Sequence, residues 1–218
     1  MHILHNNKTD NSGNLDAAEL IDQLNHTATP TEVVTLIQTL ATKRTSEAIA
    51  PLLQMLHHHH PAVSSAAVDG LVQLAPLSVE PLISAFLSCK DHGVQAYIVQ
   101  ALARIGDARA LDLLIEVVGI EVANHCQGNV RRVAARGLGK IGKKHDPQAR
   151  HLAVEKLTWA LFEAEDWALR YAAVVSLEEI ATMSVFATLQ EALTQEPDKV
   201  VQLRIQTALD NYKLTFFE

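Results

Sequence analysis

The chain is 218 residues long, 48% hydrophobic and 5% aromatic, and its formal net charge is -7. A chain of this size and apolar content buries a sizeable core. Alanine, leucine and valine outnumber the aromatic residues, which favours closely packed helices over a β-sandwich, so we expect an all-α fold. The negative charge argues against a general nucleic-acid surface, because such a surface needs a dense basic footprint.

The first 14 residues, MHILHNNKTDNSGN, are polar and lack the apolar core of a signal peptide. We interpret residues 1–14 as a disordered lead-in and expect residues 15–218 to form a single domain. No apolar run approaches the roughly 20 residues that span a bilayer. The two cysteines, Cys89 and Cys126, lie in differently patterned segments. We therefore expect a cytoplasmic protein without a membrane span or a structural disulfide.

One pattern of small and apolar residues returns five times along the chain, each time closing on a leucine eight residues after its start. The five copies start at Val63, Val94, Val130, Leu169 and Val201, which lie 31, 36, 39 and 32 residues apart. Each copy begins near Asp, Asn, His or Pro, which start helices, and Gly106 and Gly142 mark two of the ends. The five copies therefore predict five helices.

Apolar segments with a period near 3.6 lie between these copies and predict their partner helices. They cover residues 32–41, 48–56, 79–87, 109–118, 153–162 and 185–193. A pair of antiparallel helices of this length cannot bury its apolar face alone, so stacked neighbours supply the core. The pattern predicts an all-α α-solenoid of HEAT-like helical-hairpin repeats, whose curved inner face serves as the usual binding surface.

One repeat carries an insertion. Its two apolar segments start 20 residues apart, at Ala110 and Val130, whereas those of the preceding repeat start 13 residues apart, at Pro81 and Val94. Seven residues are therefore added, and they fall within GIEVANHCQG. Loops inserted into a repeat array often carry function, because they need not satisfy the stacking pattern.

His125 and Cys126 lie in this insertion and form a candidate reactive pair. The repeat pattern predicts a helix that begins near Asn129, so Cys126 would lie just ahead of a helix N-terminus, with Arg131 and Arg132 about a turn further on. The helix dipole and both cations favour a thiolate there. A histidine moves protons near neutral pH, and a thiolate adds transiently to an electrophilic carbon. The alternative is an ordinary buried cysteine beside a solvated histidine.

Arginines and large aromatic residues of the repeats are candidates for ligand contact. Guanidinium groups bind carboxylates bidentately, although pairing with Asp and Glu of neighbouring repeats is an equally good use of them. Aromatic rings flank flat conjugated ligands, although core packing is their commoner use. The candidates are Arg131, Arg132, Arg136, Arg170, Tyr97, Trp159, Trp167 and Tyr171.

Two further features are assigned no chemistry. The four histidines at 57–60 precede Pro61 between two predicted helices, and we interpret them as a solvated turn. Cys89 ends an apolar helix and is interpreted as helix-end packing. We expect no zinc site near Cys126, because no C-x-x-C or spaced histidine pair completes four ligands there.

The segments AAVDGL, ALARIGDARALDLL, VRRVAARGLGKI and LRYAAVVSLEEIA resemble the repeats of the HEAT-repeat phycobilin lyases of cyanobacteria, specifically the smaller subunit of the two-subunit type. The resemblance extends from about Ser46 to about Tyr212. Within that family, NHCQGN resembles a short motif of the phycoerythrocyanin α-chain lyase/isomerase, which its phycocyanin lyase relatives lack.

The resemblance implies a subunit that works with a larger HEAT-repeat subunit. Together they would attach phycocyanobilin, a substrate and not a cofactor, through a thioether to a cysteine of a phycobiliprotein α-chain and isomerise it to phycoviolobilin. It implies catalytic roles for His125 and Cys126 and no metal. The substrate contacts that we expect are Asn124, Arg131, Arg132, Arg170, Trp167, Tyr171 and Tyr97. A lyase subunit that does not isomerise, and a non-catalytic HEAT scaffold or bilin carrier, are the alternatives.

Overall fold

The structure is a computed structural model that describes residues 15–119, 125–144 and 146–216. Side chains at 125–127 and 215–216 are outside the description, as is the predicted lead-in at 1–14. Within the described residues every regular element is a helix, so the predicted all-α fold is confirmed. The chain divides into two compact units, Met1–Ser78 and Val79–Glu218. The single domain expected over 15–218 stays a prediction.

The described part of the first unit consists of helical pairs and a short 3-10 turn. Its elements are α1 (Ala17–His26), α2 (Pro30–Thr42), η1 (Ser46–Ala48), α3 (Ile49–Met55) and α4 (Pro61–Gln73). The histidine run lies in the turn between α3 and α4, as predicted, and the rings of His58 and His59 stack with centroids 4.3 Å apart.

Helix α1 is not among the helices that the periodicity predicts. Its start nevertheless carries a capping box, in which the Asp16 carboxylate accepts a hydrogen bond from the Glu19 amide at 2.8 Å and the Glu19 carboxylate accepts one from the Asp16 amide at 2.9 Å. Such a reciprocal pair satisfies two amides that the helix leaves without partners. The D-x-x-E spacing at Asp16 was one available sequence signal.

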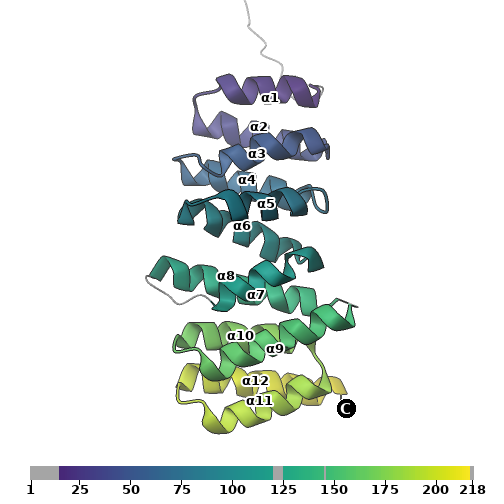
Figure 1. Cartoon of the computed structure of the whole chain (residues 1–218), viewed down its shortest axis with the longest axis vertical. Coiled ribbons are helices and arrows are strands. Elements are labelled where there is room, and N and C mark those ends of the chain that lie inside the picture. The colour runs from purple at the N-terminus through teal and green to yellow at the C-terminus, as the bar shows by residue number, and fades with distance from the viewer. Residues whose placement is uncertain (1–14, 120–124, 145, 217–218) are drawn as a thin grey trace, which may run out of the picture. The chain divides into compact units, whose positions relative to one another are not determined.

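The second unit is a stack of four helical pairs that follow one another in chain order in its described part (Figure 1). The pairs are α5 (Val79–Ser88) with α6 (His92–Ile105), α7 (Leu111–Gly119) with α8 (His125–Gly142), α9 (Pro147–Glu163) with α10 (Trp167–Ile180), and α11 (Met183–Gln195) with α12 (Lys199–Phe216); η2 (Ala108–Ala110) precedes α7. Gly106 ends α6 with a φ of 61°, a left-handed conformation that glycine adopts without steric cost. Each pair matches two predicted segments, so the predicted helical hairpins are confirmed.

Helix α8 packs against α6, α7, α9 and α10. Glycines on two sides of α8 allow α6 and α10 to approach it closely. A Cβ atom on Gly137 would lie 2.8 Å from the Ala103 Cα of α6, and a Cβ atom on Gly139 would lie 2.8 Å from the Ser176 Cα of α10. Real Cβ atoms do not approach backbone so closely, so both neighbouring helices touch α8 through backbone.

Gly139→Ala and Gly137→Ala should each lower the free energy of unfolding, although alanine is the better helix former. The intrinsic gain is about 1 kcal/mol, whereas overpacking against backbone costs about 1–3 kcal/mol. We expect a net loss of up to about 2 kcal/mol by urea denaturation. Gly128→Ala on the same helix is the control, because its Cβ would meet nothing nearer than 3.9 Å. If all three variants were equally stable, backbone contact would not govern α8 packing.

Candidate functional site

Helix α8 begins at His125, four residues before the predicted start near Asn129, so that prediction was wrong. The helix is 18 residues long, whereas α6 and α10 have 14 each, because the insertion lengthens it at its N-terminal end. The repeat pattern indicates where a helix begins to pack, which is not where its hydrogen bonding begins. Cys126 therefore belongs to the first turn of α8, where the positive end of the dipole still acts.

The predicted reactive pair can be placed only by its backbone. His125 and Cys126 occupy adjacent positions of α8, about 100° apart around the helix axis. Their side chains lie outside the described residues, as does Asn124 entirely. The roles of these three residues stay predictions.

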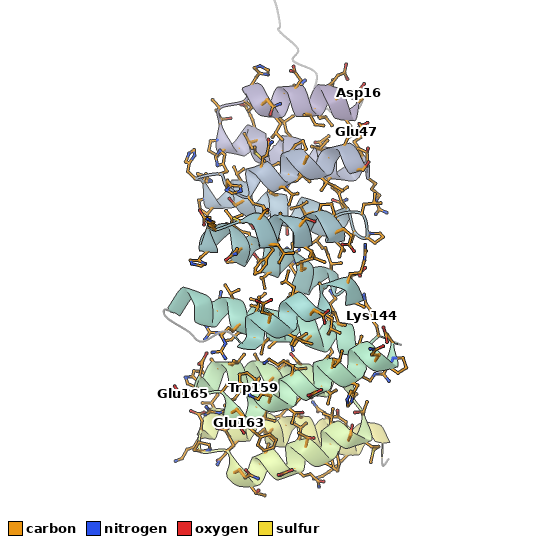
Figure 2. All side chains as sticks on the ribbon, in the orientation of Figure 1. Asp16, Glu47, Lys144, Trp159, Glu163 and Glu165 are labelled. Carbon is orange, nitrogen blue, oxygen red and sulfur yellow. The ribbon has the colours of Figure 1, made fainter. Side chains whose placement is uncertain are left out.

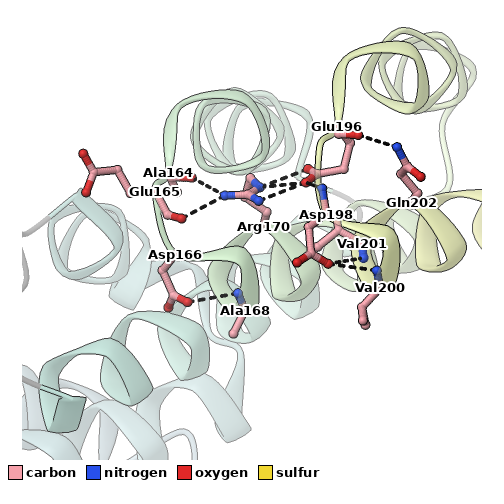
Figure 3. Close-up of polar contacts among 10 residues, drawn as sticks. All are labelled: Ala164, Glu165, Asp166, Ala168, Arg170, Glu196, Asp198, Val200, Val201 and Gln202. Atoms are coloured by element: carbon pink, nitrogen blue, oxygen red, sulfur yellow. Dashed lines mark hydrogen bonds and ion pairs between the residues drawn. The ribbon is translucent and has the colours of Figure 1, made fainter.

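Arg170 of α10 is a structural link between helical pairs (Figure 3). Its Nε and Nη2 donate to the Glu196 carboxylate at 3.0 and 2.9 Å, and its Nη1 donates to the Ala164 and Glu165 carbonyls at 2.9 Å each. The two side chains of the ion pair are 12% and 3% exposed. These contacts favour the alternative of intramolecular pairing for Arg170; its predicted role in substrate contact is untested.

Arg132 and Arg136 are also paired with carboxylates of the next repeat. Arg132 lies 3.2 Å from the Asp166 carboxylate, which also caps α10 by accepting from the Ala168 amide at 3.0 Å (Figure 3). Arg136 lies 3.6 Å from the Glu179 carboxylate. Each arginine joins α8 to α10, so both have an internal electrostatic role.

Arg131 differs from these three arginines. Its Nε donates to the Val118 carbonyl at 2.9 Å, and no carboxylate of the described residues lies in ion-pair contact with it. Burial lowers its pKa, and the charge of Asp166 opposes that shift only in part. It also lines a pocket of about 150 Å³ within the second unit. The other lining residues are Phe86, His92, Gln95, Ala96, Val117 and Val130.

None of the predicted aromatic contacts lines this pocket. Tyr97 and Tyr171 are half-buried, and Trp167 at the start of α10 is 48% exposed. Trp159 of α9, labelled in Figure 2, is 38% exposed, and the Lys156 ammonium lies 3.8 Å from its ring centroid.

Lys156 is a candidate that the sequence reasoning missed. Burial lowers its pKa, and the positive charge of Arg131 lowers it further, so the two cations lie within electrostatic reach of each other. A lysine three residues before a tryptophan on one helix face was the only sequence signal. That spacing alone does not indicate a second cation from another helix.

Cys89 follows α5, half-buried, with its Sγ 3.7 Å from the Asp91 carbonyl. Among the described side chains, no three His, Cys, Asp or Glu residues cluster so that they could hold a metal ion. None of the helices, over the residues that the structure describes, is long and apolar enough to cross a membrane.

The sequence and the fold are similar to known proteins. The HEAT repeats family matches residues 79–152 and 117–210, which confirms the predicted repeats. The chain is 56% identical to the bilin biosynthesis protein PecF of Mastigocladus laminosus, over 89% of this chain and 94% of that protein. It is 32% identical to the phycocyanobilin lyase subunit beta of a Nostoc species, over 87% and 97%. A chain in the structure of the CpcE and CpcF complex of phycocyanin lyase from Nostoc matches with a TM-score of 0.65 and 30% identity, over 75% of this chain and 99% of that chain.

Arg170→Ala should lower the free energy of unfolding by about 3–5 kcal/mol, because it leaves the Glu196 carboxylate buried without its cation. Urea denaturation measures the loss. Lys213→Ala is the control: its pair with Asp210 is 60% and 56% exposed, so about 0–1 kcal/mol is expected. An Arg170→Ala variant of unchanged stability would contradict this structural role.

Proposed function

The chain belongs to the family of HEAT-repeat phycobilin lyase subunits, and on that premise we propose that it is the smaller subunit of a two-subunit lyase/isomerase. The enzyme attaches phycocyanobilin through a thioether to a cysteine of the phycoerythrocyanin α-chain and isomerises it to phycoviolobilin. The observation that carries this proposal is the 56% identity to PecF over 94% of that protein. The reaction takes phycocyanobilin as its substrate, needs no cofactor or metal in this chain, and takes place in the cytoplasm.

The isomerisation moves a double bond from the bridge between the first two pyrrole rings into the first ring. One proton leaves and one is added, so the atoms balance without an oxidant. The His125 imidazole can carry such a proton near neutral pH. The Cys126 thiolate can add to an electrophilic carbon of the bilin and leave again, which holds the intermediate. The position of both residues in the first turn of α8 supports these roles, because that end of a helix favours an anion.

A larger HEAT-repeat subunit is the proposed partner. The similarity to a chain from the CpcE and CpcF complex supports a heterodimer. Helix α12, the last of the second unit, also leaves large apolar side chains exposed: Val200 at 52%, Leu203 at 70% and Leu214 at 60%. Their helical spacing places them on one side of α12, and exposed apolar patches of this kind mark interaction sites.

Co-expression with the larger subunit, the acceptor α-chain and a source of phycocyanobilin tests the proposal. The absorption spectrum of the purified α-chain should be that of a phycoviolobilin adduct, blue-shifted from the phycocyanobilin adduct because conjugation is shorter. Omitting either subunit should abolish this product. A red-shifted adduct with both subunits present would make the protein a non-isomerising lyase subunit, the alternative that the 32% identity to a phycocyanobilin lyase subunit favours.

Attachment and isomerisation should be separable. Cys126→Ser loses the polarisable nucleophile and His125→Ala loses the proton carrier, whereas both variants leave the packed part of α8 intact. Each should give an α-chain with unisomerised phycocyanobilin, seen as red-shifted absorption. Cys89→Ser is the matched control, because it removes the other cysteine, outside α8, and should give the wild-type spectrum. Wild-type yields of phycoviolobilin adduct from both α8 variants would remove the pair from the mechanism.

A further inference from the structure

Two cations from different helices converge on the C-terminal end of α7. Arg131 of α8 donates from Nε to the Val118 carbonyl at 2.9 Å. Lys156 of α9 reaches Gly119, the residue after Val118. Its Nζ lies 2.8 Å from the position that a Cβ atom on Gly119 would occupy. The absence of a side chain at Gly119 therefore makes room for the ammonium group.

The positive charge at this place is not neutralised by the residues that the structure describes. The ion pairs among them include no carboxylate partner for Arg131 or Lys156. The end of α7 supplies a partial charge of about -0.5, which offsets only part of two full positive charges. Burial lowers the pKa of both groups; the charge of Asp166 opposes this shift at Arg131 only in part, and the charge of Arg131 adds to it at Lys156.

The repeat alignment explains why Arg131 has no ion-pair partner among the described residues. Val130-Arg131 and Leu169-Arg170 are equivalent positions, and the ion-pair partner of Arg170 is Glu196, five residues before Val201. The equivalent position in the preceding repeat, five residues before Leu169, is Ala164. The carboxylate that neutralises Arg170 thus has no counterpart for Arg131.

The surroundings of the two cations suit a conjugated carboxylic acid. Arg131 lines the pocket of about 150 Å³, whose apolar wall includes Phe86, Val117 and Val130. An apolar cavity of about this volume holds one small aromatic ring. On the side of Lys156, the partly exposed Trp159 ring adds a second aromatic surface.

We propose that Arg131 and Lys156 form a carboxylate site that binds a propionate of the bilin, with one pyrrole ring in the adjoining pocket. The identity of the ligand rests on the proposed function. Arg131 follows Cys126 by five positions on α8, a rise of about 8 Å along the helix. The carboxylate site is therefore close, along the helix axis, to the proposed reactive pair.

Binding of phycocyanobilin and of its dimethyl ester to the two-subunit complex tests this site, because the ester keeps the rings and removes the negative charges. Wild-type protein should prefer the free acid. Lys156→Met should weaken binding of the acid about tenfold or more, as expected for a lost charge-assisted contact, without changing ester affinity. Lys156→Arg should retain the preference. Lys144→Met, just after the C-terminal end of α8, makes the same charge change away from the site and should have no effect.

Ala164→Glu gives a second test, because it restores the internal carboxylate that the repeat lacks. The new carboxylate should compete with the propionate and weaken acid binding, again without changing ester affinity. Equal weakening of acid and ester in Lys156→Met, or unchanged affinity for both, would overturn the site. The product spectrum distinguishes failure of the proposed function from failure of the site. If the wild-type complex makes no phycoviolobilin, the proposed function is contradicted. If Lys156→Met nevertheless abolishes the preference for the free acid, the site is supported.

Discussion

Backbone contact between α8 and its neighbours is the constraint on which the second unit depends. Gly137 and Gly139 stand in a helix interior, where glycine costs about 1 kcal/mol relative to alanine. Glycine is nevertheless the better residue at both positions, because any Cβ atom would lie within 2.8 Å of Ala103 or Ser176 and would force the helices apart. Helix α8 is consequently fixed on both sides along its packed length, by α6 at Gly137 and by α10 at Gly139.

Arg170 and Arg131 occupy equivalent positions of two repeats but differ in their contacts. Arg170 is held by a carboxylate that is 3% exposed and by two carbonyls, and so contributes to stacking. Arg131 stands at the equivalent position but meets the Val118 carbonyl and a second cation, Lys156. The difference between the structural Arg170 and the proposed ligand-binding Arg131 therefore depends on the residue that the next repeat places opposite, Glu196 or Ala164.

The sequence predicts most of the fold, because a period of 3.6 directly reports burial on one helix face. We did not predict α1, although its capping box at Asp16 and the i, i+4 spacing of Leu20 and Leu24 are both helix signals. The sequence does not predict the start of α8 either, because the first turns of that helix precede its packed residues. Among the site residues, the sequence finds Arg131 but not Lys156. The role of Lys156 arises from its approach to Gly119 on another helix, and a linear pattern contains no information on that contact.

The placement of the carboxylate site relative to α8 has a chemical consequence. Arg131 and Cys126 belong to one helix, so in the proposed site a bilin held by its propionate stays close to the first turn of α8. Such fixed positioning raises the effective concentration of a reacting group by orders of magnitude. A modest thiolate fraction at Cys126 would then suffice for transient addition, because proximity compensates for weak activation. Loss of the Lys156 contact should accordingly slow isomerisation even when the reactive pair is intact.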